Sequence, residues 1–283
     1  MSKWYSSSKK RGTTGGNTYA IVNGQTIERE KAVQVKNPRT GLQMAQRVKW
    51  ANLVFFWTLS GLAMLKGFID KKKNQSWFNA FMSLNLGVPG TYLTKAEAAA
   101  KTCIAAPYYV ARGPLSHAPI SEITNPDIEF LLSIGTTKPT TIGALSLLIV
   151  NQWSGWVNGD KLCILVTVQD SVDNNVVTSF AKAELVLDVA STASLPLGFE
   201  IGGAGTTESP YIFNFSAAAA GVQDFNSAAV VHTRKRANKI STSTEQMVIV
   251  NEAGNDHRTE VYKQTAITSY DADAPVFYDP DAE

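Results

Sequence analysis

Residues 161–189 read KLCILVTVQDSVDNNVVTSFAKAELVLDV. Two runs rich in aliphatic and β-branched side chains, Leu162–Gln169 and Val176–Val189, flank the turn-forming residues Asp173–Asn175. In the second run apolar residues alternate with more polar ones, which predicts a strand with one face toward water. The segment therefore predicts two antiparallel strands joined by a turn.

Similar short runs extend from this pair in both directions along the chain. Turn residues such as VNGD at Val157–Asp160 separate them, and no helical pattern alternates with them. Further strands are therefore expected at Ile128–Ile134, Leu145–Val150, Tyr211–Phe215, Ala228–Thr233, Gln246–Val250 and Thr259–Thr265. Together these runs predict an antiparallel β-sandwich over residues 102–268.

Residues 37–101 carry helical signals instead. Asn37 suits the position just before a helix, and Pro38 suits its first residue. Apolar residues then recur at steps of three and four, in the stripe Met44, Val48, Ala51, Phe55, Leu59 and Leu62. The Ser-Gly pair at 60–61 is expected to break this helix, and Ser76 to cap a second short one. We call residues 37–101 the helical docking segment and expect its many aromatic residues to pack in a core or an interface.

The apolar stretch Trp50–Ile69 is about as long as a membrane-spanning helix. It contains Lys66 together with Asn, Thr, Ser and Gly residues, and basic residues flank both of its ends. A buried helix or helical hairpin is therefore expected, and no membrane.

Residues 1–36 are expected to form a basic extended arm, because their Ser, Gly and Lys residues bury little apolar area. Within the arm, Ala20–Val22 and Gln25–Ile27 flank Asn23 and Gly24, a signal for a two-residue turn, so a small hairpin is expected. The N-terminus lacks the apolar core of a secretory signal, which favours folding in the cytosol.

Charge divides the chain unequally. Residues 1–75 carry 14 Lys and Arg against 3 Asp and Glu, whereas residues 76–283 carry 12 against 21. The near-neutral total of +2 thus combines a basic N-terminal part with an acidic remainder. Such a division is typical of a protein that attaches to an oppositely charged partner, including further copies of itself.

Residues 269–283 form an acidic tail in which carboxylates surround aromatic side chains. One hypothesis is a solvated terminus. The other is a docking strip, in which Phe277 and Tyr278 bury area while Asp271 and Asp273 meet a basic surface on a neighbour.

Cations and aromatic residues are interleaved near the N-terminus, at Lys3, Trp4, Tyr5, Lys9, Lys10 and Arg11. This pattern can bind a phosphate backbone and stack on bases, so a nucleic-acid-binding module is an alternative. The same residues suit an acidic protein surface equally well. A second basic run, His232–Lys239, is expected at the tip of a hairpin loop.

Residue types that carry chemistry are scarce. There are three histidines, His117, His232 and His257. None lies in a recognised metal or hydrolase motif. Cys103 and Cys163 fit neither a CxxC nor a zinc spacing and are expected to be buried and free. The turn at 170–175 offers oxygen ligands of the kind calcium prefers, but in a spacing unlike an EF-hand. The sequence therefore predicts no enzyme, no metal and no cofactor.

Three parts of the sequence carry a resemblance to a known family: a helix start, a later turn and a late pair of strands. The helix start NPRTGLQMAQR, residues 37–47, is NPRTxxQxxQR-like, and the later turn matches at Asn79, Ala80, Phe81 and Asn85. AVVHTRK at Ala229–Lys235 and STSTEQM at Ser241–Met247 are similar to a late strand pair. With these motifs the chain resembles uncharacterised proteins of gut Bacteroidetes and their phages. The resemblance implies an aromatic-rich helical segment followed by Ig-like strands and, by analogy with crAss-like phage virions, an auxiliary capsid protein.

The sequence thus predicts an α+β protein with a basic arm, a helical docking segment, an Ig-like antiparallel β-sandwich and an acidic tail. Its expected function is that of a virion structural protein of a tailed bacteriophage, made in the host cytoplasm and bound to other capsid or connector subunits and to copies of itself. A head-tail junction or tail component is the alternative within the same class. The residues expected to bind partners are Lys3, Trp4, Tyr5, Lys9, Lys10, Arg11, Arg39, Arg47, Asp271, Asp273, Phe277 and Tyr278.

Overall fold

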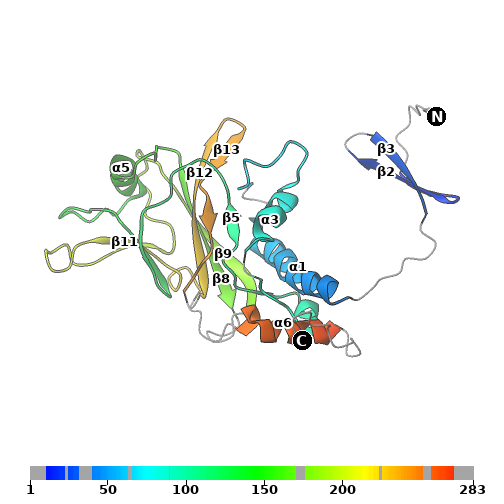
Figure 1. Ribbon diagram of the computed structural model, residues 1–283. Helices are drawn as coiled ribbons and strands as arrows, with labels where there is room; N and C mark the ends of the chain where they lie inside the picture. The colour runs from blue at the N-terminus through cyan, green and yellow to red at the C-terminus, as the bar shows by residue number, and fades with distance from the viewer. Residues whose placement is uncertain are drawn as a thin grey trace. The chain divides into compact units, whose positions relative to one another are not determined.

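The computed structural model divides the chain into two compact units, Met1–Thr40 and Gly41–Glu283 (Figure 1). It describes residues 11–22, 25–31, 40–62, 66–88, 90–169, 176–222, 225–250 and 256–270. Each unit has its own sheets, so the two are described separately.

The N-terminal unit holds a three-stranded antiparallel sheet in the order β1-β2-β3. Its strands are β1 (Gly12–Thr14), β2 (Asn17–Val22) and β3 (Gln25–Glu30). Val22 pairs with Gln25, and the register continues to Asn17 opposite Glu30. The expected hairpin is therefore confirmed, and it is longer than predicted, with a third strand at its edge.

The second unit is built on a six-stranded antiparallel sheet in the order β13-β12-β8-β9-β4, with β15 also paired to β12. Its strands are β4 (Cys103–Ile104), β8 (Lys161–Gln169), β9 (Val176–Val186), β12 (Ser227–Arg236), β13 (Lys239–Thr242) and β15 (Val248–Ile249). The pair β8 and β9 is the pair that the opening stretch of sequence predicts, in register from Lys161 opposite Val186. These two strands lie at the centre of the sheet.

A second antiparallel sheet, in the order β10-β11-β7-β6, covers one face of the first. It is made of β6 (Ile120–Ile123), β7 (Asp127–Phe130), β10 (Phe199–Gly202) and β11 (Ile212–Ser216). Leu162, Ile164 and Val166 of β8 pack in one core with Phe130 of β7 and Phe213 of β11. The expected α+β fold with a β-sandwich is therefore confirmed.

Helices cover the opposite face of the central sheet (Figure 1). They are α1 (Gly41–Ser60) and α3 (Trp77–Asn85), the latter capped by the Ser76 side chain as predicted. Phe56 and Phe81 pack in a second core with Cys163 and Leu165 of β8, the residues that alternate with those of the first core. Both faces of the sheet are thus buried, and both cysteines lie within it and are free.

The buried face of α1 differs from the predicted stripe. Met44 and Val48 are buried as expected, but the helix then continues at steps of four, so that Asn52, Phe56 and Ser60 are buried. Residues 51, 55 and 59 are only half-buried. The helix ends at Ser60, where the following Gly61 has a φ of +63°, as predicted. The predicted start at residues 37–38 lies outside the described residues.

None of the helices in the described part of the chain has the length and apolar character that crossing a membrane requires.

Two runs predicted as strands are helices. Leu145–Val150 lies in α5 (Ile142–Gln152), where Thr141 caps the helix and accepts a hydrogen bond from the Ala144 N–H. The prediction was wrong because a short apolar run does not distinguish a strand from a buried helix. Thr259–Thr265 lies largely in α6 (Glu260–Tyr270), where packing against α1 outweighs the strand preference of Val and Thr side chains.

Glu97 fastens α6 to the rest of the unit. It lies in α4 (Lys95–Ala100), and its carboxylate accepts hydrogen bonds from Tyr262 at 2.6 Å and from the His257 ring at 2.8 Å. His257 belongs to the short 3-10 helix η1 (Asp256–Arg258). Because α6 continues to Tyr270, it crosses the boundary at residue 268 that was expected to end the sandwich. The helical segment and the sandwich share one compact unit.

Two buried asparagines join the helices to the segment that holds β4 and β5 (Tyr109–Ala111). The Asn52 side chain donates to the Ile104 carbonyl and accepts from the Ile104 N–H at 2.8 Å. The Asn85 side chain likewise donates to the Tyr109 carbonyl and accepts from the Tyr109 N–H at 2.7 Å. Each amide therefore replaces a strand neighbour for a buried backbone segment.

Replacing Asn85 with Ala is expected to lower the free energy of unfolding by about 2–4 kcal/mol, because the backbone N–H and C=O of Tyr109 lose their partner. Asn79→Ala on the exposed face of the same helix is the matched control, with an expected change of about 0.5 kcal/mol or less. Equilibrium urea unfolding measures both. Equal effects of the two substitutions would contradict the assigned role of Asn85.

Candidate functional site

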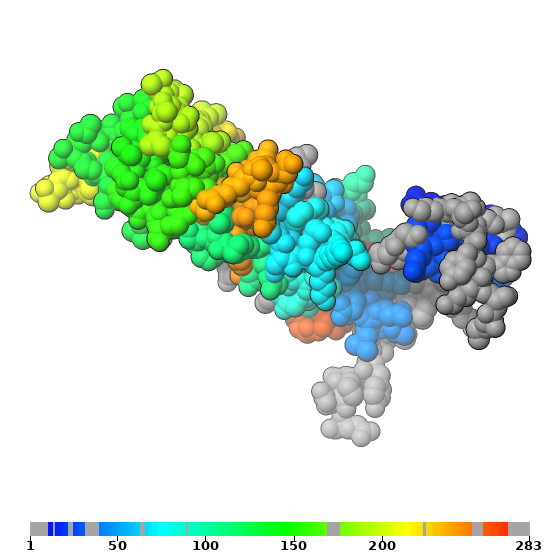
Figure 2. All heavy atoms as spheres, turned by 90° about the horizontal axis from the view of Figure 1, so that it is seen from above, coloured from blue at the N-terminus to red at the C-terminus, as the bar shows by residue number. Residues whose placement is uncertain are grey.

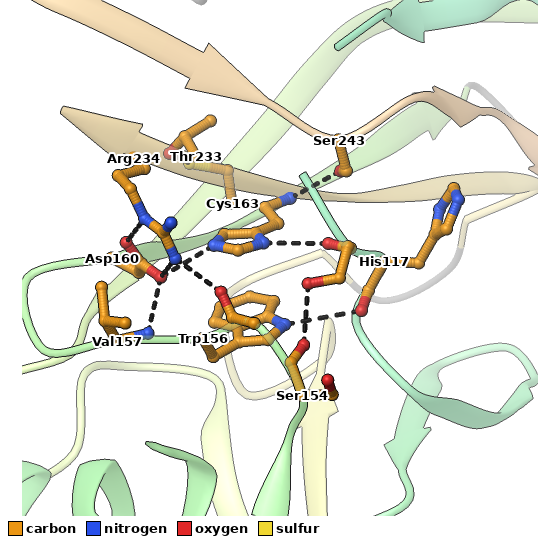
Figure 3. Close-up of polar contacts among 12 residues, drawn as sticks. His117, Ser154, Trp156, Val157, Asp160, Cys163, Thr233, Arg234 and Ser243 are labelled. Atoms are coloured by element: carbon orange, nitrogen blue, oxygen red, sulfur yellow. Dashed lines mark hydrogen bonds and ion pairs between the residues drawn. The ribbon is translucent and has the colours of Figure 1, made fainter. Parts of the chain in front are cut away.

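The most highly charged buried cluster in the described part of the chain joins three segments of the sandwich (Figure 3). Asp160 comes from the turn before β8, and His232 and Arg234 come from β12. Trp156 precedes the turn and stacks on the His232 ring with centroids 3.7 Å apart and an angle of 11° between the planes. The sequence VNGD forms the predicted turn here, with an Asp160 N–H bond to the Val157 carbonyl.

Asp160 accepts four hydrogen bonds. Arg234 donates to both carboxylate oxygens at 2.7 Å, and the Val157 N–H donates at 2.8 Å. The Nε2 atom of His232 lies 2.9 Å from Oδ2 of Asp160, while its Nδ1 atom lies 2.9 Å from the carbonyl oxygen of Ser116. Both ring nitrogens therefore lie within hydrogen-bond distance of an oxygen, and the ring bridges Asp160 and the Ser116 segment.

The side chains of His232 and Asp160 are 0% and 1% exposed. Burial by itself would raise the pKa of Asp160, but hydrogen bonds from Arg234, His232 and the Val157 N–H outweigh burial and lower it to about 2. The carboxylate is therefore ionised and fully hydrogen-bonded. A group that is enclosed in this way holds the turn, β12 and the Ser116 segment together, and it does not face a cavity where a substrate could bind.

A cleft of about 600 Å³ lies at one end of the second sheet. Its wall includes Leu131, which is 60% exposed, with Trp153 and Tyr211. The Gln152 side chain accepts a hydrogen bond from the Ser133 N–H at 2.8 Å and donates one to the Ser133 carbonyl at 2.7 Å. The chain thus leaves β7 after Phe130, earlier than the predicted end at Ile134. Glu129 and Tyr211 are the titratable residues of this lining, and most of the others are apolar or neutral, so the cleft resembles a contact surface more than a site for chemistry.

The N-terminal sheet is a third candidate, because none of its described side chains is buried. Ile27 is 46% exposed and lies opposite Ala20, so the two share one face. On the other face Glu28 accepts hydrogen bonds from Asn17 at 2.5 Å and from Tyr19 at 3.0 Å. The Ile27 face is therefore apolar at its centre, while the Glu28 face carries these internal hydrogen bonds beside Ile21. The exposed Ile27 side chain marks its face as a surface for contact.

Only two of the predicted partner-binding residues lie in the described part of the chain. Arg11 is exposed just before β1 in the N-terminal unit. Arg47 is exposed on α1, with its guanidinium 3.7 Å from the Met44 sulfur. The predictions for the others, and for a calcium-type turn at 170–175, lie outside the described residues: Lys3, Trp4, Tyr5, Lys9, Lys10, Arg39, Asp271, Asp273, Phe277 and Tyr278.

The basic run His232–Lys239 is not a loop along its whole length. Residues 232–236 lie in β12, and only Ala237 and Asn238 form the tip between Arg236 and Lys239. The sequence did carry a signal for the buried cluster: His232 and Arg234 are two residues apart, so they share one face of a strand. It did not show that Asp160 lies in the turn just before the neighbouring strand β8.

Asp160→Asn is expected to lower the free energy of unfolding by about 3 kcal/mol at pH 7, since it leaves the largely buried guanidinium of Arg234 without its counter-charge. An acid whose pKa is lowered by folding stabilises the protein above its ordinary pKa, and this stabilisation is lost as the pH falls toward the folded value. The difference in the free energy of unfolding between Asp160→Asn and the unsubstituted chain should therefore shrink between about pH 4 and pH 2.

Urea unfolding across this pH range measures the effect, with Glu200→Gln at an exposed position of β10 as the control. The control should leave the free energy of unfolding within about 0.5 kcal/mol at neutral pH. A difference for Asp160→Asn that stays constant from pH 7 to pH 2.5 would refute the role of the ionised carboxylate.

Comparison with protein families gave one match: residues 6–126 match a family of unknown function (DUF6266). The search of curated proteins and the search of solved structures found no match. The matched stretch spans the N-terminal sheet, the helices α1, α3 and α4 and the strands up to β6, and it ends before β7. The chain is therefore similar to this family over less than half of its length, in the part that carries the arm and the helical layer.

Proposed function

We propose that the chain is a structural protein of a tailed-phage virion, most specifically an auxiliary capsid protein that attaches to neighbouring subunits through its N-terminal unit. The proposal assigns it no reaction and no cofactor. The observation that supports it is that the N-terminal sheet has no buried side chain among its described residues, whereas the second unit has cores of its own.

A small sheet needs an apolar face covered by something else to be stable in water. The described side chains of β3 are all exposed, and the apolar pair Ile27 and Ala20 lies at the centre of one face. The outer edge of β3 also presents backbone groups that another strand could pair with. Contact with a neighbouring subunit would cover the apolar face and would pair the free edge of β3.

An assembled particle suits this arrangement for a second reason. Each copy makes only a modest contact through a short sheet, and many copies on one shell convert modest contacts into stable attachment. The phage assignment itself depends on the resemblance in the helix start and in the turn at Asn79–Asn85. A head-tail junction or tail protein would use the same arm, and its position in the particle would distinguish it from a capsid protein.

Ile27→Asp in the full chain is expected to reduce the copies incorporated into purified particles by at least about tenfold, because a charge would be buried at the contact. Thr26→Asp, on the opposite face of the same strand, is the matched control and should be incorporated normally. Quantitative mass spectrometry of the particles measures both, and thermal unfolding checks that the body of each variant is intact.

Deletion of residues 1–36 should have the same effect as Ile27→Asp. Two results would overturn the proposal. One is normal incorporation of the shortened chain, and the other is the absence of the unsubstituted, full-length chain from purified particles. Gold labelling of the particles places the protein on the shell or at the tail.

A further inference from the structure

Three hollows with a largely basic lining lie on the second unit, and together they are called the basic groove. The first, of about 120 Å³, lies between Lys161, Lys182 and Lys235; the second, of about 330 Å³, lies between Lys66 and Lys239. Ile240 lines both of them. The third, of about 280 Å³, is lined by Asp70, Lys71 and Lys72, which follow Ile69 of the second hollow in the sequence.

The two walls of the groove come from distant parts of the sequence. Figure 2 shows the β12–β13 hairpin beside the segment that holds Lys66 and α3. The Thr242 hydroxyl donates to the Gly67 carbonyl at 2.9 Å, and the Arg112 N–H donates to the same carbonyl at 2.8 Å. These bonds fix the wall that carries Lys66 against the hairpin that carries Lys239.

Positive charge exceeds negative charge in the groove. Nine Lys and Arg side chains line it, against the two acids Asp70 and Glu184. Asp70 pairs with Arg112 at 2.7 Å, Glu184 pairs with both Lys161 and Lys182, and Arg234 is held by Asp160. Within the described residues, five lysines of the lining have no carboxylate partner: Lys66, Lys71, Lys72, Lys235 and Lys239.

The groove also offers apolar surface between its cations. Ile69, Trp77 and Ile240 line it and are half-buried. The Lys71 ammonium lies 5.1 Å from the centre of the Trp77 ring, so one face of that ring is already occupied by a cation. A nucleic acid strand would need free aromatic faces for base stacking. A peptide with separated acids and a few apolar side chains matches the groove better.

The acidic tail of this chain has that composition. Residues 271–283 carry five Asp and Glu and no Lys or Arg, with Phe277 and Tyr278 between Asp273 and Asp279. Its carboxylates complement the lysines, and its aromatic pair complements Ile69 and Ile240. The charge match would raise the association rate and the specificity of the contact.

The position of α6, which ends away from the groove, allows the tail that follows it to reach another copy. Its Ala266 and Ile267 pack on Met44 and Val48 in the first half of α1, whereas the groove lies beyond the last residue of that helix. A helix of this length spans about 30 Å. In Figure 1, β13 and α6 lie at opposite ends of the helical side of the body. A contact from the α6 end of one copy to the groove end of the next joins copies head to tail.

We propose that the basic groove around Lys66, Trp77 and Lys239 binds the acidic C-terminal tail, residues 271–283, of a second copy of this chain. The inference deepens the proposed assembly role by naming a partner and a surface. It is independent of the N-terminal sheet, so the tail contact can fail while incorporation still depends on Ile27, and the reverse also holds.

The test uses two variants of the full chain. The groove variant carries Lys66→Glu and Lys239→Glu, and the tail variant carries Asp279→Asn and Asp281→Asn. Analytical ultracentrifugation should show concentration-dependent association of the unsubstituted chain that weakens at least about tenfold in each variant and with increasing salt. Lys95→Glu with Lys138→Glu, two exposed positions outside the groove, is the control of equal charge change and should associate like the unsubstituted chain.

Mixing the two variants provides the decisive measurement. The groove variant keeps an intact tail and the tail variant keeps an intact groove, so the mixture should form heterodimers although each variant alone is weakened. A mixture that stays monomeric, or an unsubstituted chain that is monomeric because its own tail fills the groove, would overturn the proposal. So would binding of a 20-nucleotide DNA that requires Lys66 and Lys239 while self-association does not.

Discussion

The central sheet is buried on both faces, and the rest of the fold follows from this constraint. In β8 every residue from Leu162 to Thr167 is buried. Alternate side chains therefore need two separate apolar layers, because successive residues of a strand point to opposite faces. The second sheet supplies one layer, and the helices α1 and α3 supply the other. The helical segment is thus a required layer of the body.

Polar side chains fix how these layers meet. Asn52 and Asn85 each pair with both backbone groups of one residue in the strand segment beneath the helices, so that sliding would leave buried groups unpaired. On the sandwich side, Asp160 joins His232 and Arg234 in the same way. Apolar burial gives the layers their stability, and these few bonds select one register among many apolar contacts of similar energy.

The tertiary structure brings lysines from the basic and the acidic parts of the sequence together on one surface. Counted along the sequence, the basic residues concentrate before residue 76 and the remainder is acidic. In the folded body, Lys66 from the basic part lies beside Lys239 from the acidic part, and Lys161 and Lys182 extend the same groove. The acidic part therefore contributes six of the nine Lys and Arg side chains that line this basic surface. A chain that carries both such a groove and an acidic tail has the complementary charges that a contact between copies requires.

The sequence by itself determined strands whose side chains alternate or are continuously apolar, such as those predicted at 162–169 and 176–189, and the helix ends marked by Ser76 and Gly61. In the structure the second of these strands ends at Val186, three residues earlier than predicted. These signals are local, because they depend on spacing and on capping residues that lie within one turn. Only the tertiary structure decided that residues 145–150 and 259–265 are helical, since packing against α1 and the sandwich outweighs their weak local preference. It also decided the buried cluster and the basic groove. Both bring together residues that are more than 70 positions apart, and no local pattern records which strands become neighbours.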